Sequence, residues 1–312
     1  MKGRSDRVSH TPNEGTMKTL HGILPVLVTP LTSDERVDEK GLRRLIRHVM
    51  QASNSAVVIC GSMGEFASLK AEERKRTIEI AVEEVGGKVP VVAGTGDAGT
   101  RKAIENTQVA EKAGANYALI TLPYYYRTDH AGSVAHYRGI VKETGIRIVI
   151  YNIPEFTGVG VDVEAVKELG RDQRVCGIKD AGGDFAYFQK LVHEMEGSKH
   201  FSVIQGWDSL IFSGFVYGGD GAIVWASNLV PELPVRLYRA IRDGNLEEAR
   251  SIQGELLKLG GIMQKRKSLH ASVKAALSLM DICKATVSAP ITPLSVEEMK
   301  GLEIDLKEFG LL

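Results

Sequence analysis

From Ile23 onward, eight short apolar runs rich in valine and isoleucine alternate with longer amphipathic segments. Several runs are apolar at every position, as expected of parallel strands that are covered on both faces. Eight strand–helix repeats fit a closed (β/α)8 barrel better than an open doubly wound sheet, which usually has about five or six strands. The predicted strands are Ile23–Thr29, Ala56–Cys60, Val89–Gly94, Tyr117–Thr121, Ile146–Tyr151, Val175–Lys179, Phe201–Gln205 and Ala222–Trp225.

The segments between and after these runs place apolar residues three and four positions apart, which predicts helices. After Trp225 the chain carries only helical patterns. We therefore predict a barrel over residues 19–242, a C-terminal helical domain over residues 243–312, and a polar, disordered tail over residues 1–18. The predicted helices include Glu39–Gln51, Ala71–Val85, Thr100–Lys112, His130–Glu143, Val163–Leu169, Pro231–Ile241, Leu246–Leu259, Leu269–Leu279 and Ser295–Glu308.

The composition narrows the classes of partner. The 312 residues include 39 Lys and Arg against 39 Asp and Glu, and this balance argues against a surface for nucleic acid. No segment reaches the roughly 18–20 uninterrupted apolar residues of a membrane span. Three widely separated cysteines, Cys60, Cys176 and Cys283, indicate neither a disulfide framework nor a zinc knuckle, so we expect a reducing, cytoplasmic compartment.

The carboxyl ends of the strands hold the candidates for chemistry, because the active sites of (β/α)8 barrels lie there. Lys179 ends the otherwise apolar sixth run. An amine in a barrel interior loses hydration, releases its proton more readily and can attack a ketone to form a Schiff base. The alternative is a structural lysine that reaches solvent and pairs with Asp180. Tyr151 ends the fifth run, either as a phenol at the barrel mouth or as a structural tyrosine.

Two loops that follow predicted strands also stand out. After the second strand, the turn Gly61-Ser62-Met63-Gly64-Glu65 offers free backbone amides that could hold a carboxylate, although a bare glycine-rich turn is equally plausible. After the fourth strand come three adjacent tyrosines, residues 124–126, which cannot all face the same interior. At least one projects to solvent or to a neighbouring subunit, and an aromatic interface without a catalytic role would also explain them.

Together these motifs resemble the dihydrodipicolinate synthase and N-acetylneuraminate lyase family of class I aldolases. The resemblance runs from about Leu20 to the C-terminus. It implies a (β/α)8 barrel with a C-terminal helical domain, a homotetramer built as a dimer of dimers, and chemistry on pyruvate without a metal or organic cofactor. It rests on Gly61-Ser62-Met63-Gly64-Glu65, Tyr124-Tyr125, Tyr151-Asn152-Ile153-Pro154, Gly177-Ile178-Lys179-Asp180, Gly206-Trp207-Asp208 and Gly219-Asp220-Gly221-Ala222.

The resemblance also implies roles for individual residues. Lys179 matches the lysine that forms the imine with pyruvate, and Tyr151 matches the tyrosine that moves protons beside it. Ser62 matches the hydroxyl that links this relay, and Tyr125 the tyrosine that reaches into a neighbour's site. The amides of Ser62 and Met63 would hold the pyruvate carboxylate. The candidate substrate-binding residues are Gly61, Ser62, Met63, Phe156, Gly206, Asp208 and Trp225.

Departures from the family pattern bear on the second substrate. Phe156 stands where dihydrodipicolinate synthases carry an arginine that clamps a carboxylate, and an aromatic ring cannot supply those donors. Met63 replaces a usual hydroxyl residue, and Ser209 replaces a glutamate that sialic acid lyases use. The bulky Trp225 stands at the end of the eighth predicted strand, where related lyases and aldolases tend to have small residues. We therefore expect an aldolase for a shorter 2-oxo acid, such as a 2-keto-3-deoxy sugar acid or 4-hydroxy-2-oxoglutarate.

Other functions remain open at this point. One is dihydrodipicolinate synthesis from pyruvate and aspartate semialdehyde, and another is the dehydration of a related 2-oxo acid. A third is a non-catalytic sensor that binds an oxo acid. An unrelated barrel enzyme that grips phosphate is disfavoured, because Asp220 in the glycine-rich turn would repel the anion.

Overall fold

The structure is a computed structural model that describes residues 20–312. Eight parallel strands form one sheet in the order β1-β8-β7-β6-β5-β4-β3-β2, and the predicted (β/α)8 barrel is confirmed. The predicted tail over residues 1–18 lies outside the described residues. The strands are β1 (Gly22–Pro25), β2 (Val57–Ile59), β3 (Val91–Gly94), β4 (Tyr117–Thr121), β5 (Arg147–Asn152), β6 (Val175–Asp180), β7 (Ser202–Gln205) and β8 (Gly221–Val224).

A change of partner along the first strand closes the barrel. The amide of Val26 donates to Val224 of β8, but the next amide, that of Leu27, donates to Val58 of β2. Val26 also forms a parallel bridge with Val58. The strand predicted at Ile23–Thr29 is therefore shorter, because the chain leaves β8 for β2 after Val26.

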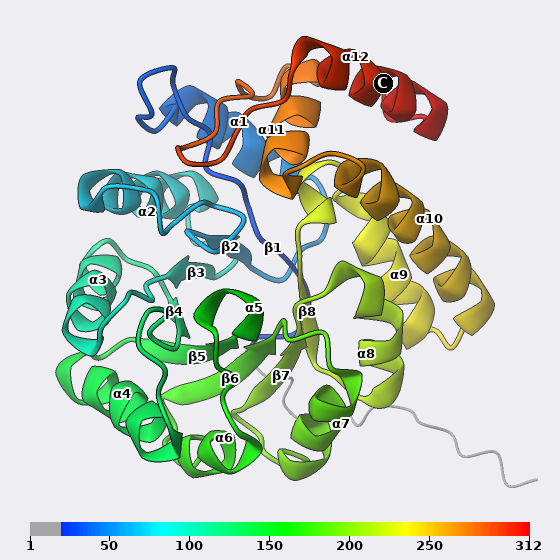
Figure 1. The fold of residues 1–312 in the computed structure, drawn as a ribbon. Coiled ribbons are helices and arrows are strands. Elements are labelled where there is room, and N and C mark those ends of the chain that lie inside the picture. The colour runs from blue at the N-terminus through cyan, green and yellow to red at the C-terminus, as the bar shows by residue number, and fades with distance from the viewer. Residues whose placement is uncertain (1–19) are drawn as a thin grey trace, which may run out of the picture.

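Helices surround the barrel and connect successive strands (Figure 1). The short helix α5 instead lies across the mouth of the barrel, directly after β5. Three further helices, α10 to α12, follow the barrel units. The helices are α1 (Glu39–Val49), α2 (Ala71–Val85), α3 (Thr100–Lys112), α4 (His130–Glu143), α5 (Pro154–Thr157), α6 (Val163–Leu169), α7 (Phe185–Glu194), α8 (Ile211–Tyr217), α9 (Glu232–Arg242), α10 (Leu246–Gln264), α11 (Leu269–Leu279) and α12 (Val296–Phe309).

Local sequence explains where helix α1 begins and which face it buries. The Asp38 carboxylate accepts a hydrogen bond from the amide of Gly41, which satisfies one of the free donors of the first turn. Leu42, Leu45 and Val49 recur at helical spacing and are fully buried against the barrel. The helix thus follows directly from its cap and its apolar stripe.

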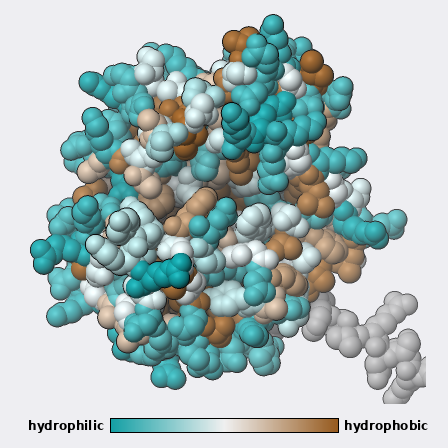
Figure 2. Space-filling model, in the orientation of Figure 1, coloured by the Kyte–Doolittle hydropathy of each residue, from teal (hydrophilic) through white to brown (hydrophobic). Residues whose placement is uncertain are grey.

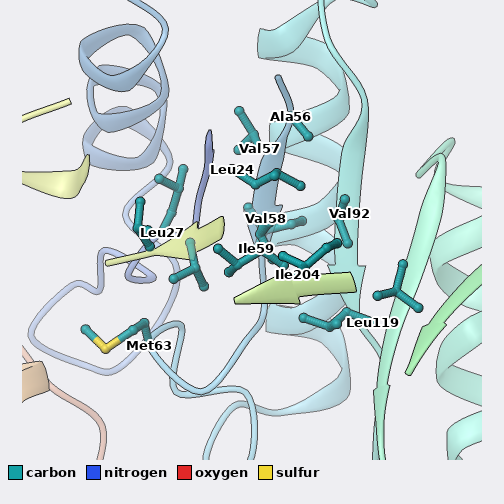
Figure 3. Close-up of a cluster of buried hydrophobic side chains, with 14 of the residues drawn as sticks. Leu24, Leu27, Ala56, Val57, Val58, Ile59, Met63, Val92, Leu119 and Ile204 are labelled. Carbon is teal, nitrogen blue, oxygen red and sulfur yellow. The ribbon is translucent and has the colours of Figure 1, made fainter. Parts of the chain in front are cut away.

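Aliphatic side chains of the strands fill the core. Figure 3 shows Val57, Val58 and Ile59 of β2 between side chains of β1 and β3, with Leu119 of β4 further along the same layer. Burial of both faces explains the continuous apolar runs in the sequence. On the outside, Figure 2 shows hydrophobic residues scattered among hydrophilic ones, and no helix within residues 20–312 is long and apolar enough to cross a membrane.

The C-terminal helices pack on the barrel through buried contacts. Helix α10 lies along α9, and the Gln253 side chain donates to the carbonyl oxygen of Asp208 and accepts from the amide of Phe212. Helix α10 continues through Gly260 and Gly261 to Gln264, beyond its predicted end at Leu259. Met263 is fully buried, so packing holds the last turn in place despite the two glycines.

Candidate active site

Lys179 lies at the carboxyl end of β6 with its side chain inside the barrel, where only 3% of the residue is exposed. Its Nζ is 4.2 Å from the centre of the Tyr151 ring. No carboxylate among residues 20–312 forms an ion pair with this amine. The Asp180 carboxylate accepts hydrogen bonds from the Asn152 side chain and from the Gly182 amide instead, and burial raises its pKa. The arrangement thus differs from the Lys179–Asp180 pair expected of a structural lysine.

Tyr151 on β5 is the neighbour of Lys179 on β6, and both side chains point to the same face of the sheet. The strand register pairs Thr121 with Tyr151 and Tyr151 with Lys179, and paired residues of parallel strands point to the same face. The Tyr151 hydroxyl is 3.1 Å from Oγ of Ser62 in the loop after β2, at hydrogen-bond distance. The amine, the phenol and the serine hydroxyl are therefore contiguous, which suits the transfer of protons at a carbon bound to the amine.

The glycine-rich turn that carries Ser62 has a constrained backbone. Cys60 and Glu65, at its two ends, have positive φ values of 52° and 57°, which are unusual for residues with side chains. Within the described chain, the amides of Ser62 and Met63 donate no hydrogen bond. Two free neighbouring amides are suited to a carboxylate. The Met63 side chain is buried in the core, so this residue offers the site its backbone.

Helix α11 and the loop after it support this turn from behind. Nε2–H of His270 donates to the carbonyl oxygen of Ser62 at 3.0 Å. Lys274, fully buried, forms an ion pair with the buried Glu65 carboxylate. The amide of Ser288 donates to the other oxygen of Glu65 at 2.6 Å. The C-terminal helices thus hold the turn that presents Ser62, a role that the sequence analysis did not foresee.

Gly206 and Asp208 follow β7 on the other side of Lys179. A Cβ atom at Gly206 would lie 2.8 Å from Cε of Lys179, so glycine leaves room for the lysine side chain. The Asp208 carboxylate accepts hydrogen bonds from the amides of Trp225 and Ala226 at 3.3 and 2.9 Å. Burial raises the pKa of Asp208 to about 7, although the nearby Lys179 opposes this shift. Both residues therefore shape the surroundings of the lysine.

The tyrosines after β4 separate into two environments. Tyr124 contacts Phe66 edge to face, with ring centres 6.4 Å apart, and burial together with the adjacent Asp97 carboxylate raises its pKa. Tyr125 and Tyr126 are 79% and 76% exposed. Their rings meet edge to face at 5.1 Å on the outside of the chain. Tyr125 thus does not reach Lys179 of its own chain.

A cavity of about 210 Å³ adjoins Tyr151 and Ser62. Phe156 of α5 lines it and is 54% exposed at the barrel mouth. Thr121 and His270 also line it, whereas Lys179 does not. Tyr151 lies between Lys179 and the cavity, because its ring contacts the lysine amine and the residue also lines the cavity. Within residues 20–312, no three His, Cys, Asp or Glu side chains are grouped so that they could hold a metal ion.

Comparison with known proteins identifies the family. A family model described as the Dihydrodipicolinate synthetase family matches residues 19–309. The chain belongs to this family. The family resemblance and the barrel fold predicted from the sequence are therefore confirmed.

Relatives of this family member cover almost the whole chain. This chain is 35% identical to the 4-hydroxy-tetrahydrodipicolinate synthase of Methanococcoides burtonii, over 93% of this chain and 99% of the relative. It is 36% identical to the Chlorobium limicola protein of the same name over 95% and 99% of the two chains. Such relatives are lyases, and this chain is a lyase of the same family.

Solved structures of similar proteins have the same fold. YagE, a prophage protein of the dihydrodipicolinic acid synthase family from E. coli K12, was solved in complex with pyruvate. It matches with a TM-score of 0.89 and 31% identity over 94% of this chain and 99% of YagE. The dihydrodipicolinate synthase of Thermotoga maritima matches with a TM-score of 0.89 and 33% identity over 94% and 100%.

The structure brings together only some of the residues singled out from the sequence. Lys179, Tyr151 and Ser62 are contiguous, and Gly206 and Asp208 flank the lysine. Phe156 lines the same cavity as Tyr151. Trp225 lies beside Asp208, because the backbone amide of Trp225 donates a hydrogen bond to the Asp208 carboxylate. Gly61 packs against Val26 at the start of the turn, and Tyr125 points away. The contributions of Thr121, His270 and Lys274 were missed, since none of them belongs to a recognisable motif.

Proposed function

We propose that this chain forms a Schiff base between Lys179 and pyruvate, and makes or breaks a carbon–carbon bond at C3 of the bound pyruvate. One observation carries the proposal. Lys179 is a buried amine without an ion pair, 4.2 Å from the ring centre of a tyrosine that is in turn bonded to Ser62. An unpaired amine held away from water is suited to attack a ketone.

The geometry supports a role for each group in the reaction. Nζ of Lys179 attacks C2 of pyruvate, water leaves, and the resulting iminium accepts electrons when C3 loses a proton, giving an enamine. Tyr151 and Ser62 pass the protons, a contribution of typically about 10²–10⁴ in rate. The free amides of Ser62 and Met63 hold the pyruvate carboxylate. Gly206 keeps space for the lysine side chain.

Trapping the imine tests this proposal. The protein is incubated with pyruvate and sodium borohydride, and its mass is measured intact and after peptide digestion. We expect one pyruvate-derived adduct on Lys179 in the wild type and none in Lys179→Ala. The matched control is Lys142→Ala, which removes an exposed lysine of α4 and should keep the adduct. An adduct of equal yield in Lys179→Ala would disprove the assignment.

Several reactions are candidates for the second half of the chemistry. The names of the relatives favour the condensation of pyruvate with aspartate semialdehyde. Phe156 opposes this, because its ring cannot bind the carboxylate of the semialdehyde. The departures from the family pattern suggest instead the cleavage of a 2-keto-3-deoxy sugar acid or 4-hydroxy-2-oxoglutarate, or a dehydration of such an acid, although Phe156 offers no partner to the second carboxylate of 4-hydroxy-2-oxoglutarate. Turnover of each compound by the purified protein separates these reactions.

We further propose a homotetramer in the cytoplasm. Exposed Tyr125 and Tyr126 support an interface between subunits, since aromatic residues are enriched at the centres of such contacts. Cys60, Cys176 and Cys283 are all buried free thiols, which suits a reducing compartment.

A further inference from the structure

The walls of the cavity beside Tyr151 are apolar. Phe66, Ile153, Phe156 and Ile291 contribute to its lining, and they come from the loop after β2, the end of β5, helix α5 and the loop before α12. A substrate that extends from the bound pyruvate past Tyr151 would contact these side chains. Apolar atoms of the substrate gain about 25 cal/mol for each Å² of surface that they bury there.

No cation among residues 20–312 lines this cavity. Its one carboxylate, Glu65, is already paired with Lys274 and bonded to the Ser288 amide. Its one imidazole, His270, donates to Ser62, and burial lowers the pKa of this imidazole, which disfavours its cationic form. A carboxylate on the substrate would therefore lose hydration without gaining a partner, which is costly.

Two hydroxyl groups mark the end of the cavity that is nearest to Lys179. The Tyr151 hydroxyl lies there beside Ser62. Thr121 also lines the cavity, but its Oγ1 is buried and lies against the position that a Cβ atom of Gly96 would take, so the hydroxyl faces Gly96. The reacting aldehyde oxygen is the polar atom that such an end would receive.

We propose that the second substrate of this enzyme is a small aldehyde whose substituent is uncharged and apolar, with Phe156 as a specificity-determining residue. The inference rests on the proposed Schiff-base function and departs from the second substrates considered there. The cavity volume of about 210 Å³ suits a substituent such as a short aliphatic chain or a single ring, because pockets for drug-sized ligands measure roughly 300–1,000 Å³.

The reaction balances without any further reactant. C3 of the Lys179-bound enamine forms a bond to the aldehyde carbon, and the carbonyl electron pair moves to the aldehyde oxygen. That oxygen takes a proton from Tyr151. Water then hydrolyses the iminium, which releases a 4-hydroxy-2-oxo acid and restores the lysine amine. The reverse sequence cleaves the same acid.

A matched set of aldehydes tests the inference. Pyruvate consumption is measured with 3-methylbutanal and benzaldehyde as apolar partners, with succinic semialdehyde and aspartate semialdehyde as carboxylate partners, and with glyceraldehyde as a polar, uncharged one. We expect kcat/KM for 3-methylbutanal to exceed that for succinic semialdehyde by at least about tenfold, because a buried site rejects a group that it cannot pair. A higher value for either carboxylate aldehyde or for glyceraldehyde would overturn the inference.

Two variants at one position make the test specific. Phe156→Arg should raise kcat/KM for succinic semialdehyde and lower it for 3-methylbutanal, since the guanidinium supplies the missing donors. Phe156→Leu keeps the wall apolar and should preserve the wild-type order of substrates. An unchanged order in Phe156→Arg would contradict the role of Phe156.

Arg127 provides the critical control. This exposed residue does not line the cavity, but its Nε would lie 4.0 Å from a Cβ atom at Gly158, close to helix α5. Arg127→Gln should leave the substrate order unchanged. Loss of activity with succinic semialdehyde alone would show that Arg127 binds the carboxylate, and the inference would fail.

The borohydride trap separates this inference from the function on which it rests. Each variant is first incubated with pyruvate and borohydride. Absence of the wild-type adduct would reject the Schiff-base function itself. An intact adduct combined with a preference for carboxylate aldehydes would reject only the substrate class.

Discussion

Asp208 is a buried carboxylate whose two oxygens hold the start of the segment after β8. One oxygen accepts from the amide of Ala226 and the other from the amide of Trp225. A buried charge of this kind is tolerated only when hydrogen bonds compensate for its lost hydration. Burial nevertheless raises its pKa to about 7, which shows how strongly the surroundings disfavour the charge.

Replacing this carboxylate by an amide tests its role. Asp208→Asn leaves only one acceptor oxygen and places a side-chain N–H group against a backbone N–H. We expect the free energy of unfolding in urea to fall by about 1–3 kcal/mol, the usual effect of leaving a buried polar group unpaired. Asp184→Asn is the matched control at the exposed start of α7, where asparagine caps a helix equally well, so stability should hardly change. Equal losses in both variants would argue against the proposed role.

At the scale of the element, helix α11 stabilises a turn that lies some two hundred residues earlier in the chain. Lys274 and His270 reach Glu65 and Ser62 from one face of this helix. The positive φ of Glu65 costs free energy, and these long-range contacts help to keep the turn in that conformation. The C-terminal helices are thus part of the support of the candidate active site.

Removal of one member of the buried pair tests this support. Lys274→Met leaves the Glu65 carboxylate uncompensated in the interior, so we expect the free energy of unfolding to fall by about 3–5 kcal/mol. The double variant Lys274→Met with Glu65→Gln removes both charges and should be more stable than the single one. Lys307→Met breaks an exposed ion pair with Glu303 on α12 and should change stability by less than about 1 kcal/mol. If Lys274→Met proved as stable as the wild type in urea unfolding, the proposed compensation of the Glu65 charge by Lys274 would be refuted.

At the scale of the whole molecule, the proposed tetramer would allow the exposed Tyr125 of one subunit to reach the active site of another. Tyr125→Phe should then lower kcat by about 10²-fold, the lower end of acid–base contributions. Co-expression with Lys179→Ala should restore part of the activity, since hybrid sites combine Lys179 from one chain with Tyr125 from the other. The measurement is the specific activity of hybrids purified by two different affinity tags.

A pairing within one chain is the control for these hybrids. Lys179 and Tyr151 contact each other in the same subunit, so Lys179→Ala combined with Tyr151→Phe should regain nothing. Recovery in this control, or none in the Tyr125 hybrid, would contradict the proposed sharing of the tyrosine.

Much of the fold and the centre of the site could be predicted from local sequence. Helices α2, α3, α4, α6 and α11 have the predicted bounds, because periodicity and capping residues are local signals. Lys179 and Tyr151 could be placed at the barrel mouth, since a residue at the end of a parallel strand has only one edge of the sheet to occupy.

Other features depend on contacts between distant segments. Helix α5 over the barrel mouth, the change of partner at Val26 and the extension of α10 to Gln264 each follow from packing. The sequence alone determined the barrel, the family and the amine that we propose as nucleophile, because short-range patterns encode them. Only the tertiary structure placed α11 behind the Ser62 turn and formed the apolar cavity beside Tyr151. Both features depend on contacts between side chains that are far apart in the sequence.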